Sequence, residues 1–183
     1  MTTVKEVAEI GIDADTLWHE VGDFGCVARW HPHLIGMTVS DEPAGRLRAA
    51  FLKAGGEQLE RLQAADPPHH LYRYSIERTG LPVRDYTAEF RVETIDAHTS
   101  RLVWEARFAL EEQDDKRTVE AVRYFLHEGA TSIQAKYPPY AERETDGVDT
   151  GIADADKQAR AGTVNEPIRN TPPAGAWNET TFD

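Results

Sequence analysis

The most regular hydrophobic pattern in the chain lies between Asp115 and Tyr137 and predicts one long amphipathic helix. Its apolar positions recur every three or four residues, at Val119, Val122, Leu126, Gly129 and Ile133, with Phe125 and Ala130 beside them. Asp114 and Asp115 are candidate N-caps, and Pro138 ends the helix because proline cannot continue the backbone hydrogen bonds. Gly129 costs about 1 kcal/mol relative to alanine in mid-helix. It indicates either a notch in which something lies close to the helix, or plain close packing against a strand.

The segment between Ile35 and Leu110 alternates apolar and polar residues, a pattern typical of antiparallel strands with one buried face. We predict strands over residues 4–12, 35–40, 47–53, 57–63, 71–78, 85–95 and 101–110. Two short helices follow the first strand, one through Leu17, Trp18 and Val21 and one between Phe24 and Trp30. The order of elements therefore predicts the α+β class, with about seven strands and a long C-terminal helix.

After Tyr140 the pattern is lost. Residues 141–183 are rich in Asp, Glu, Thr, Gly and Pro, and they have too few apolar side chains to bury a core of their own. We predict a folded domain over residues 1–138 and an acidic tail, extended or disordered, over 139–183. One interpretation is a solvated tail. The other is an arm whose Trp177 and Phe182 dock on this subunit or on a neighbour, which would form a homodimer.

Composition narrows the classes of partner. A hydrophobic content of 40% and four Trp favour a folded globule, and a net charge of −12 argues against nucleic acid, whose phosphates need a basic face. The single cysteine, Cys26, forms no internal disulfide, and we expect it to be a small buried apolar residue. The N-terminus lacks the pattern of a signal peptide, and no run approaches the ~20 apolar residues that span a bilayer. We expect a soluble cytoplasmic protein without membrane partners.

Three strands send large rings toward the predicted helix. The inward faces chosen by the alternation are Tyr72, Tyr74 and Ile76; Tyr86, Ala88, Phe90 and Val92; and Leu102, Trp104, Ala106, Phe108 and Leu110. Rings beside alanines, opposite a helix with a central glycine, suggest a cavity. The alternative is that the rings fill the space and their hydroxyls reach water at the sheet edge.

The hairpin around Ala54-Gly55-Gly56 carries the candidate chemistry. If Lys53 pairs with Glu57, one face holds Arg48, Ala50, Leu52, Gln58, Glu60 and Leu62, with Arg48 diagonal to Glu60. When this face looks inward, the buried carboxylate must be paired or take up a proton, and either state suits a general acid or base. The other interpretation is a surface Arg–Glu pair, with the register slipped by one.

Other motifs are weak. His31-Pro32-His33 has a spacing seen in metal sites, but no carboxylate or cysteine ligand lies at a compatible position. A glycine-rich phosphate loop, a Gly-x-Ser-x-Gly elbow and a Cys-x-x-Cys pair are all missing from the sequence. We therefore expect no metal and no organic cofactor.

Several blocks of sequence resemble one known family. They are Trp18 to Phe24 with Trp30-His31-Pro32, Gly45 to Arg48, Glu60-Arg61-Leu62, Tyr72 to Ile76, Leu81 to Tyr86 and Ser100 to Trp104. In this order they are similar to the polyketide cyclase/dehydrase-like proteins of the START-like, SRPBCC superfamily, over roughly residues 3–137. The resemblance implies the helix-grip fold, in which a curved antiparallel sheet holds the last helix with an apolar pocket between them. It also implies that Trp30, His31 and His33 lie near the entrance, where imidazoles transfer protons.

The resemblance and the inward faces together predict a pocket for an aromatic or polycyclic hydrophobic ligand. The expected activity is that of a cofactor-independent cyclase, dehydratase or lyase, with Glu60 as acid or base, Arg48 as its partner and Tyr74 as a third catalytic group. The predicted ligand-binding residues are Trp30, His31, His33, Tyr72, Tyr86, Phe90, Trp104, Phe125 and Gly129. The alternatives are a non-catalytic carrier with the same pocket, and an interaction module in which the acidic tail acts.

Overall fold

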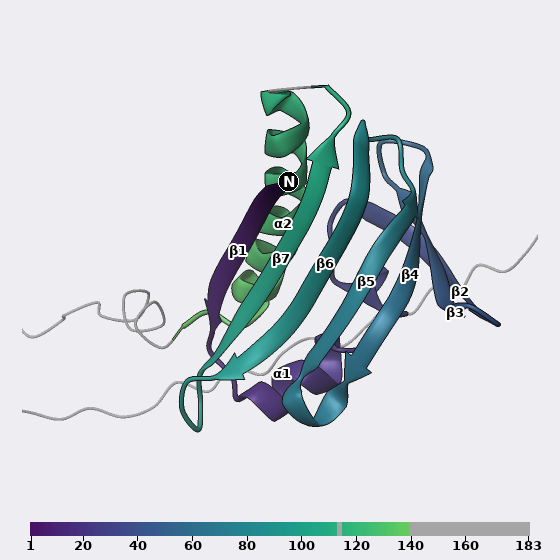
Figure 1. Ribbon diagram of the computed structural model, residues 1–183. Coiled ribbons are helices and arrows are strands. Elements are labelled where there is room, and N and C mark those ends of the chain that lie inside the picture. The colour runs from purple at the N-terminus through teal and green to yellow at the C-terminus, as the bar shows by residue number, and fades with distance from the viewer. Residues whose placement is uncertain (113–114, 140–183) are drawn as a thin grey trace, which may run out of the picture. The chain divides into compact units, whose positions relative to one another are not determined.

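The structure is a computed structural model that describes residues 1–112 and 115–139, and they form a seven-stranded antiparallel sheet with one long helix behind it (Figure 1). The strands are β1 (Thr2–Ile10), β2 (Leu34–Glu42), β3 (Gly45–Leu52), β4 (Glu57–Asp66), β5 (Leu71–Arg78), β6 (Val83–Thr94) and β7 (Ser100–Leu110). The helices are α1 (Ala14–Val21) and α2 (Lys116–Lys136), with 3₁₀ turns η1 (Val27–Arg29) and η2 (Pro67–His69). The predicted curved sheet with a C-terminal helix is confirmed, although the second short helix is only a 3₁₀ turn. The predicted tail lies outside the described residues from position 140 onward.

The order of strands across the sheet is β1-β7-β6-β5-β4-β3-β2, so the first and last strands of the chain are neighbours. Figure 1 shows α2 behind β1 and β7, with α1 at one end of the sheet. Irregular pairing interrupts β2, β4 and β6, and such bulges bend and twist a strand. The bending lets the sheet curve around the helix and enclose a space between them.

Helix α2 begins and ends where the sequence predicts. The side chain of Asp115 accepts hydrogen bonds from the backbone N–H groups of Arg117 and Thr118, which would otherwise lack partners in the first turn. The C-cap is Tyr137, directly before Pro138. The buried face consists of Thr118, Val122, Leu126, Gly129, Ala130 and Ile133, so the predicted stripe is confirmed apart from Val119 and Phe125, which are half-buried.

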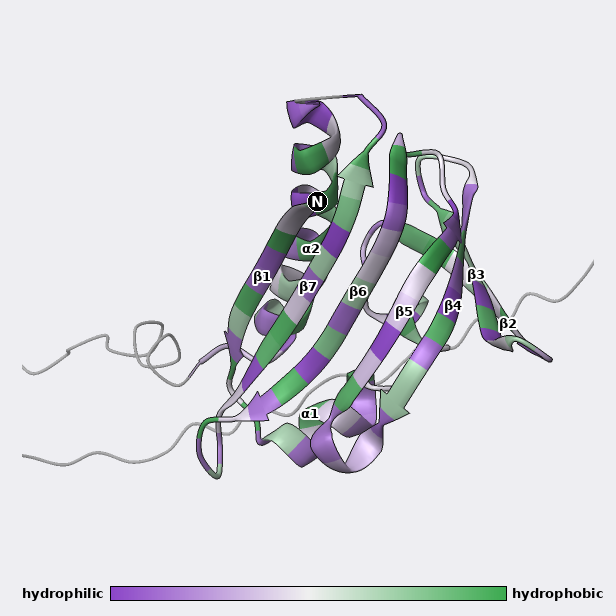
Figure 2. Cartoon of the chain, in the orientation of Figure 1, coloured by the Kyte–Doolittle hydropathy of each residue, from purple (hydrophilic) through white to green (hydrophobic). Residues whose placement is uncertain are grey.

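The two faces of the sheet differ in chemistry. On the inner face the predicted residues of β5, β6 and β7 are buried, except Ile76 and Leu110, which are half-buried. The outer face carries ion pairs, among them Arg73–Glu89 at 2.7 Å and Arg91–Glu93 at 2.8 Å. Figure 2 shows the resulting alternation of hydrophobic and hydrophilic residues along β6 and β7. Exposed ion pairs of this kind each contribute about 1 kcal/mol or less, so burial of the inner face holds the sheet on the helix.

The β3–β4 hairpin has a different register from the predicted one. Arg48 lies directly opposite Glu60, and Ala50 lies opposite Gln58, so the pairing of Lys53 with Glu57 is wrong. The turn is wider than expected because Gly55 and Gly56 both adopt positive φ, at 95° and 89°, which only glycine adopts easily. The shift is by an even number of residues, so every side chain stays on its predicted face.

Candidate functional site

A buried ion pair lies on the inner face of the sheet, between β3 and β4. Arg48 is 1% exposed and Glu60 is 3% exposed, and Arg48 Nε donates a hydrogen bond to Glu60 Oε2. Arg48 Nη1 also donates to the carbonyl oxygen of Phe24 at 2.6 Å, while Gln58 Nε2 donates to Glu60 Oε1 at 2.5 Å. The predicted inward-facing Arg–Glu pair is therefore confirmed, and the surface interpretation is excluded.

Arg48 remains a cation in this interior. Burial acts against its charge, but Glu60 and the phenols of Tyr72 and Tyr74 hold the pKa of the guanidinium above its ordinary value. The guanidinium carbon also lies 4.0 Å from the centre of the Phe24 ring and 4.8 Å from that of Tyr74, distances at which a cation is attracted to an aromatic face. The site thus combines a fixed positive charge with a carboxylate inside an aromatic environment.

An apolar cleft of about 180 Å³ opens beside this pair, between the β5–β6 loop and the N-terminal half of α2. Its lining is Leu52, Gln58, Tyr74, Ile76, Thr79, Gly80, Leu81, Tyr86, Ala121, Val122 and Phe125. Leu52, Gln58 and Phe125 also line a cavity of only about 10 Å³ that reaches Arg48 and Glu60. Gln58 therefore stands between the cleft and the ion pair.

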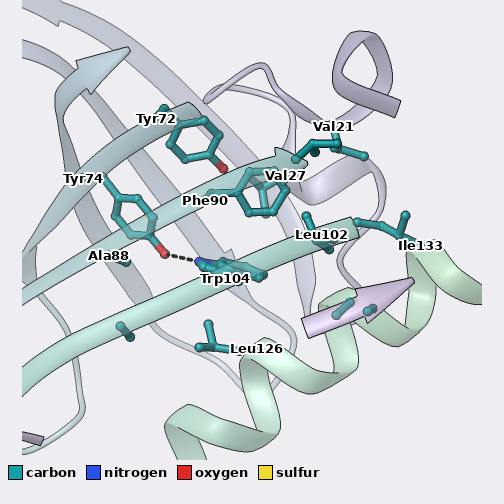
Figure 3. Close-up of a cluster of buried hydrophobic side chains, with 14 of the residues drawn as sticks. Val21, Val27, Tyr72, Tyr74, Ala88, Phe90, Leu102, Trp104, Leu126 and Ile133 are labelled. Carbon is teal, nitrogen blue, oxygen red and sulfur yellow. Dashed lines mark hydrogen bonds between the residues drawn. The ribbon is translucent and has the colours of Figure 1, made fainter. Parts of the chain in front are cut away.

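The two tyrosines of the cleft are neighbours on the inner face. Tyr74 pairs with Ala88 across β5 and β6, and Tyr86 is two residues from Ala88 on the same strand. Tyr74 Oη accepts a hydrogen bond from Trp104 Nε1 at 3.1 Å, drawn as the dashed line in Figure 3. Burial, with the nearby carboxylate of Glu60, raises the pKa of both tyrosines above the usual value. Both hydroxyls therefore keep their protons near neutral pH and act as hydrogen-bond donors.

His31 lies in the interior, at the far side of Phe125, rather than at an open entrance as the resemblance implies. It is 2% exposed, and its ring stacks on the Phe125 ring with centres 3.9 Å apart. Nδ1 accepts a hydrogen bond from the His33 backbone N–H at 3.2 Å, so Nε2 carries the proton and donates to the Phe125 carbonyl oxygen at 3.0 Å. Burial lowers the pKa of His31 to about 4. The ring is neutral, and both of its nitrogens are occupied.

His31 also explains the glycine in the middle of α2. A Cβ at Gly129 would lie 2.7 Å from His31 Cδ2 and 2.9 Å from Trp104 Cζ3, closer than side-chain atoms approach. The notch predicted from the sequence is real, and in this structure side chains of the chain itself fill it. Of the two interpretations, close packing describes the observed contacts.

The remaining predicted ligand-binding residues fall into two groups. Tyr86 and Phe125 line the cleft together with Tyr74, and Trp104 reaches the small inner cavity. The others, Tyr72 and Phe90, are labelled in Figure 3. Their ring centres are 5.1 Å apart, and Trp30 stacks on Phe90 at 5.7 Å. His33 is half-buried, with Nε2 3.7 Å from Glu128 Oε2. Their roles in binding stay predictions.

Sequence reasoning missed the loop that covers the cleft. Thr79 Oγ1 donates to Gln58 Oε1 at 3.2 Å, and Leu81 lines the cleft beside it. An apolar residue between Gly80 and Pro82 in a turn was a signal that this loop faces the interior. Gln58 had been placed on the inner face of the hairpin, but not in the site.

Other chemistry finds little support in the described part of the chain. Within residues 1–112 and 115–139, no group of three or more His, Cys, Asp or Glu side chains is arranged to hold a metal ion. None of the helices in these ranges is long and apolar enough to cross a membrane. Cys26 is 5% exposed, and burial raises the pKa of its thiol, which disfavours the nucleophilic thiolate.

Comparison with known proteins agrees with this geometry. A family model described as "Polyketide cyclase / dehydrase and lipid transport" matches residues 1–137. Among solved structures, XoxI from Bacillus cereus is similar at 22% identity and a TM-score of 0.70, covering 75% of this chain and 96% of that one. The Zhui aromatase/cyclase from Streptomyces sp. R1128 matches at 18% identity and a TM-score of 0.59, covering 82% and 98%. A START superfamily protein from Mycobacterium smegmatis matches at 13% identity and a TM-score of 0.58, covering 74% of this chain and 96% of that one. A search of curated proteins gives no match.

Proposed function

The chain belongs to the polyketide cyclase/dehydrase and lipid transport family, and from that premise we propose that it binds a small aromatic molecule in the cleft beside α2 and converts it without a cofactor. The reaction we propose is a cyclisation or dehydration. The observation that carries the proposal is the buried Arg48–Glu60 ion pair. Only the side chain of Gln58 separates it from the apolar cleft.

The chemistry follows from the position of Gln58. Its amide nitrogen donates a hydrogen bond to Glu60 Oε1, and the Gln58 side chain lines both the cleft and the inner cavity. A ligand that displaces this side chain brings its own hydrogen-bearing group to the carboxylate. Glu60 then acts as a general base in a buried position, and a positioned base contributes about 10²- to 10⁴-fold to a rate.

Arg48 and Tyr74 supply the complementary groups. The guanidinium is a fixed cation that stabilises negative charge developing on the ligand, and Tyr74 has a hydroxyl proton to donate. A dehydration needs one group to accept a proton from carbon and one to protonate the departing hydroxyl. No electrons enter or leave, so the reaction balances without a redox cofactor.

An aromatic ligand is favoured by the rings of Tyr74, Tyr86 and Phe125 around the cleft, because aromatic faces and edges pack specifically against one another. The Zhui aromatase/cyclase shares the fold, which supports this chemistry.

A carrier function is the second candidate, and one observation favours it. Both Glu60 oxygens and two Arg48 nitrogens are already bonded within the protein, so the pair is satisfied without a ligand. In that case the ion pair stabilises one conformation of the interior, and the cleft binds a ligand without converting it.

The test compares Glu60→Gln with the wild-type chain on the small molecules that co-purify with it, identified by native mass spectrometry. We expect Glu60→Gln to keep ligand affinity within about threefold and to lose turnover by about 100-fold or more, as for loss of a general base. Glu57→Gln is the matched control, because Glu57 lies on the same strand and pairs with Arg78 on the exposed side. Thermal unfolding of each variant shows that the fold is retained.

Conversion at the wild-type rate by Glu60→Gln would remove Glu60 as the base. If neither protein converts a ligand that both bind, the carrier function is correct.

A further inference from the structure

The cleft offers no charge to a ligand. Its lining consists of apolar side chains, one glycine and the uncharged polar groups of Gln58, Thr79, Tyr74 and Tyr86. An ionised ligand placed here would lose part of its hydration without gaining a charged partner, which is unfavourable. Arg48 is not part of this lining, because while Gln58 is in place it lies behind that side chain, bonded to Glu60 and to the Phe24 carbonyl. The lining therefore favours a neutral molecule.

The polar groups of the cleft are unbalanced toward donors. Gln58 Oε1 already accepts a hydrogen bond from the Thr79 hydroxyl, and Gln58 Nε2 donates one to Glu60. Tyr74 uses its oxygen to accept from Trp104, and its own proton has no acceptor among the described residues. Tyr86 makes no hydrogen bond with a described residue, and its hydroxyl is not among the polar atoms sealed from solvent. Two donors thus remain for a ligand.

Both tyrosines that carry these donors line the same cleft. Tyr74 and Tyr86 are diagonal neighbours on the inner face, where side chains of this length interact across about 7–8 Å. The electrostatic influence of Tyr86 on the pKa of Tyr74 is consistent with that proximity.

The size of the cleft limits the ligand. A dry cavity of about 150 Å³ holds one benzene ring, and this cleft measures about 180 Å³. In the observed conformation it admits one ring with a short substituent, which is smaller than the polycyclic ligand that the sequence also allowed.

We propose that the cleft selects a neutral single-ring aromatic molecule with a carbonyl oxygen, and that Tyr74 and Tyr86 both donate hydrogen bonds to that oxygen. This inference rests on the proposed function, since it names the ligand class of the same cleft. A carbonyl oxygen has two lone pairs and can accept from both unused donors at once.

The experiment measures the affinity of the full chain for three probes of similar shape by isothermal titration calorimetry: acetophenone, ethylbenzene and benzoate. Acetophenone should bind about tenfold tighter than ethylbenzene, as expected for about 1.4 kcal/mol of net hydrogen bonding, and benzoate should bind more weakly than both. Tyr86→Phe should weaken acetophenone binding about fivefold and leave ethylbenzene unchanged.

Tyr86→Phe is expected to fold, because the ring stacks on Phe108 at 5.5 Å and its hydroxyl bonds to no described residue. Tyr124→Phe is the control, since Tyr124 is 56% exposed on α2 and lies outside the cleft lining. It should change neither affinity.

The outcomes separate this inference from the proposed function. Ethylbenzene binding as tightly as acetophenone, or equal weakening of both by Tyr86→Phe, would overturn the carbonyl selection and leave the aromatic cleft standing. Failure of all three probes to bind would overturn the aromatic cleft and the inference together.

Discussion

Helix α2 meets the sheet in two ways along its length. Around Gly129, the closed half, His31, Trp104 and the rings beyond them fill the space completely. Around Ala121, the open half, the same helix borders a cleft lined by Tyr74 and Tyr86. Both halves are built from large aromatic side chains opposite a small residue on the helix.

The difference shows that ring size and alternation do not decide whether an interior is a cavity. In the closed half a side chain from outside the strands, His31, enters the gap and is held there by the Phe125 carbonyl. In the open half the nearest loop, through Thr79 and Leu81, covers the gap without entering it. Connecting segments decide which half stays open.

The largest expected effect concerns the ion pair that joins the halves, since Arg48 is bonded to Phe24 on one side and Glu60 to Gln58 on the other. Arg48→Met leaves a buried carboxylate without its cation and should lower the free energy of unfolding by about 3–5 kcal/mol in urea denaturation at pH 7. Arg73→Met, which removes an exposed partner of Glu89, should cost about 1 kcal/mol or less.

Replacing both members, as Arg48→Met with Glu60→Leu, should recover most of that loss, because no charge is left buried. A double variant as unstable as the single one would mean that the pair positions the two halves by more than its charge.

The next largest effect is a loss of folding stability at low pH, caused by His31 in the closed half. Burial lowers the pKa of His31 from 6.5 to about 4, so between these values the unfolded chain takes up a proton that the folded chain excludes. Stability from this group is complete above pH 6.5 and is lost as the pH falls toward 4. The difference corresponds to about 3 kcal/mol. Urea denaturation at pH 7, 5.5 and 4 checks it.

The comparison is with His31→Asn, which does not titrate in this range and should show a smaller loss of stability over the same steps. Carboxylates common to both proteins cancel in the difference. Parallel curves for the two proteins would mean that His31 accepts a proton without leaving its place.

The smallest effect compares the two halves directly. Gly129→Leu forces side-chain atoms against His31 and Trp104 and should destabilise the fold by about 2 kcal/mol, within the range for overpacked cores. If Gly129 were a ligand-binding notch, the other interpretation of the sequence, the same change would mainly weaken ligand binding. Ala121→Leu, on the same helix, should change stability by about 0.5 kcal/mol or less and should weaken binding of aromatic probes, because Ala121 is exposed and lines the cleft.

Similar losses of stability for both variants, measured by urea denaturation, would show that the two halves are equally packed and that the cleft is not a separate region.

Much of the fold was accessible from the sequence because it rests on local periodicity. The faces of β5, β6 and β7, the span of α2 and its Asp115 cap all follow from patterns within one element. The inward position of Arg48 and Glu60 survived an incorrect register, since a shift by two residues keeps the face.

The site was less accessible because it depends on contacts between distant segments. His31 reaches Phe125 across 94 positions, and no local pattern indicates that this ring fills the notch at Gly129. Gln58 and Thr79 meet only because the β4 start and the β5–β6 loop lie side by side. Tertiary packing decides which gaps a loop enters, and the periodicity of a strand does not predict it.

Phe125 belongs to both halves, since its ring borders the cleft and its carbonyl holds the imidazole of His31. The Nε2–H proton of that imidazole is buried and hydrogen-bonded, so it exchanges slowly with solvent and gives its own signal in a proton NMR spectrum. A molecule bound in the cleft, as proposed above, would contact the ring of the same residue. With the proposed ligand bound, we expect the chemical shift of this proton to change, although His31 itself does not line the cleft.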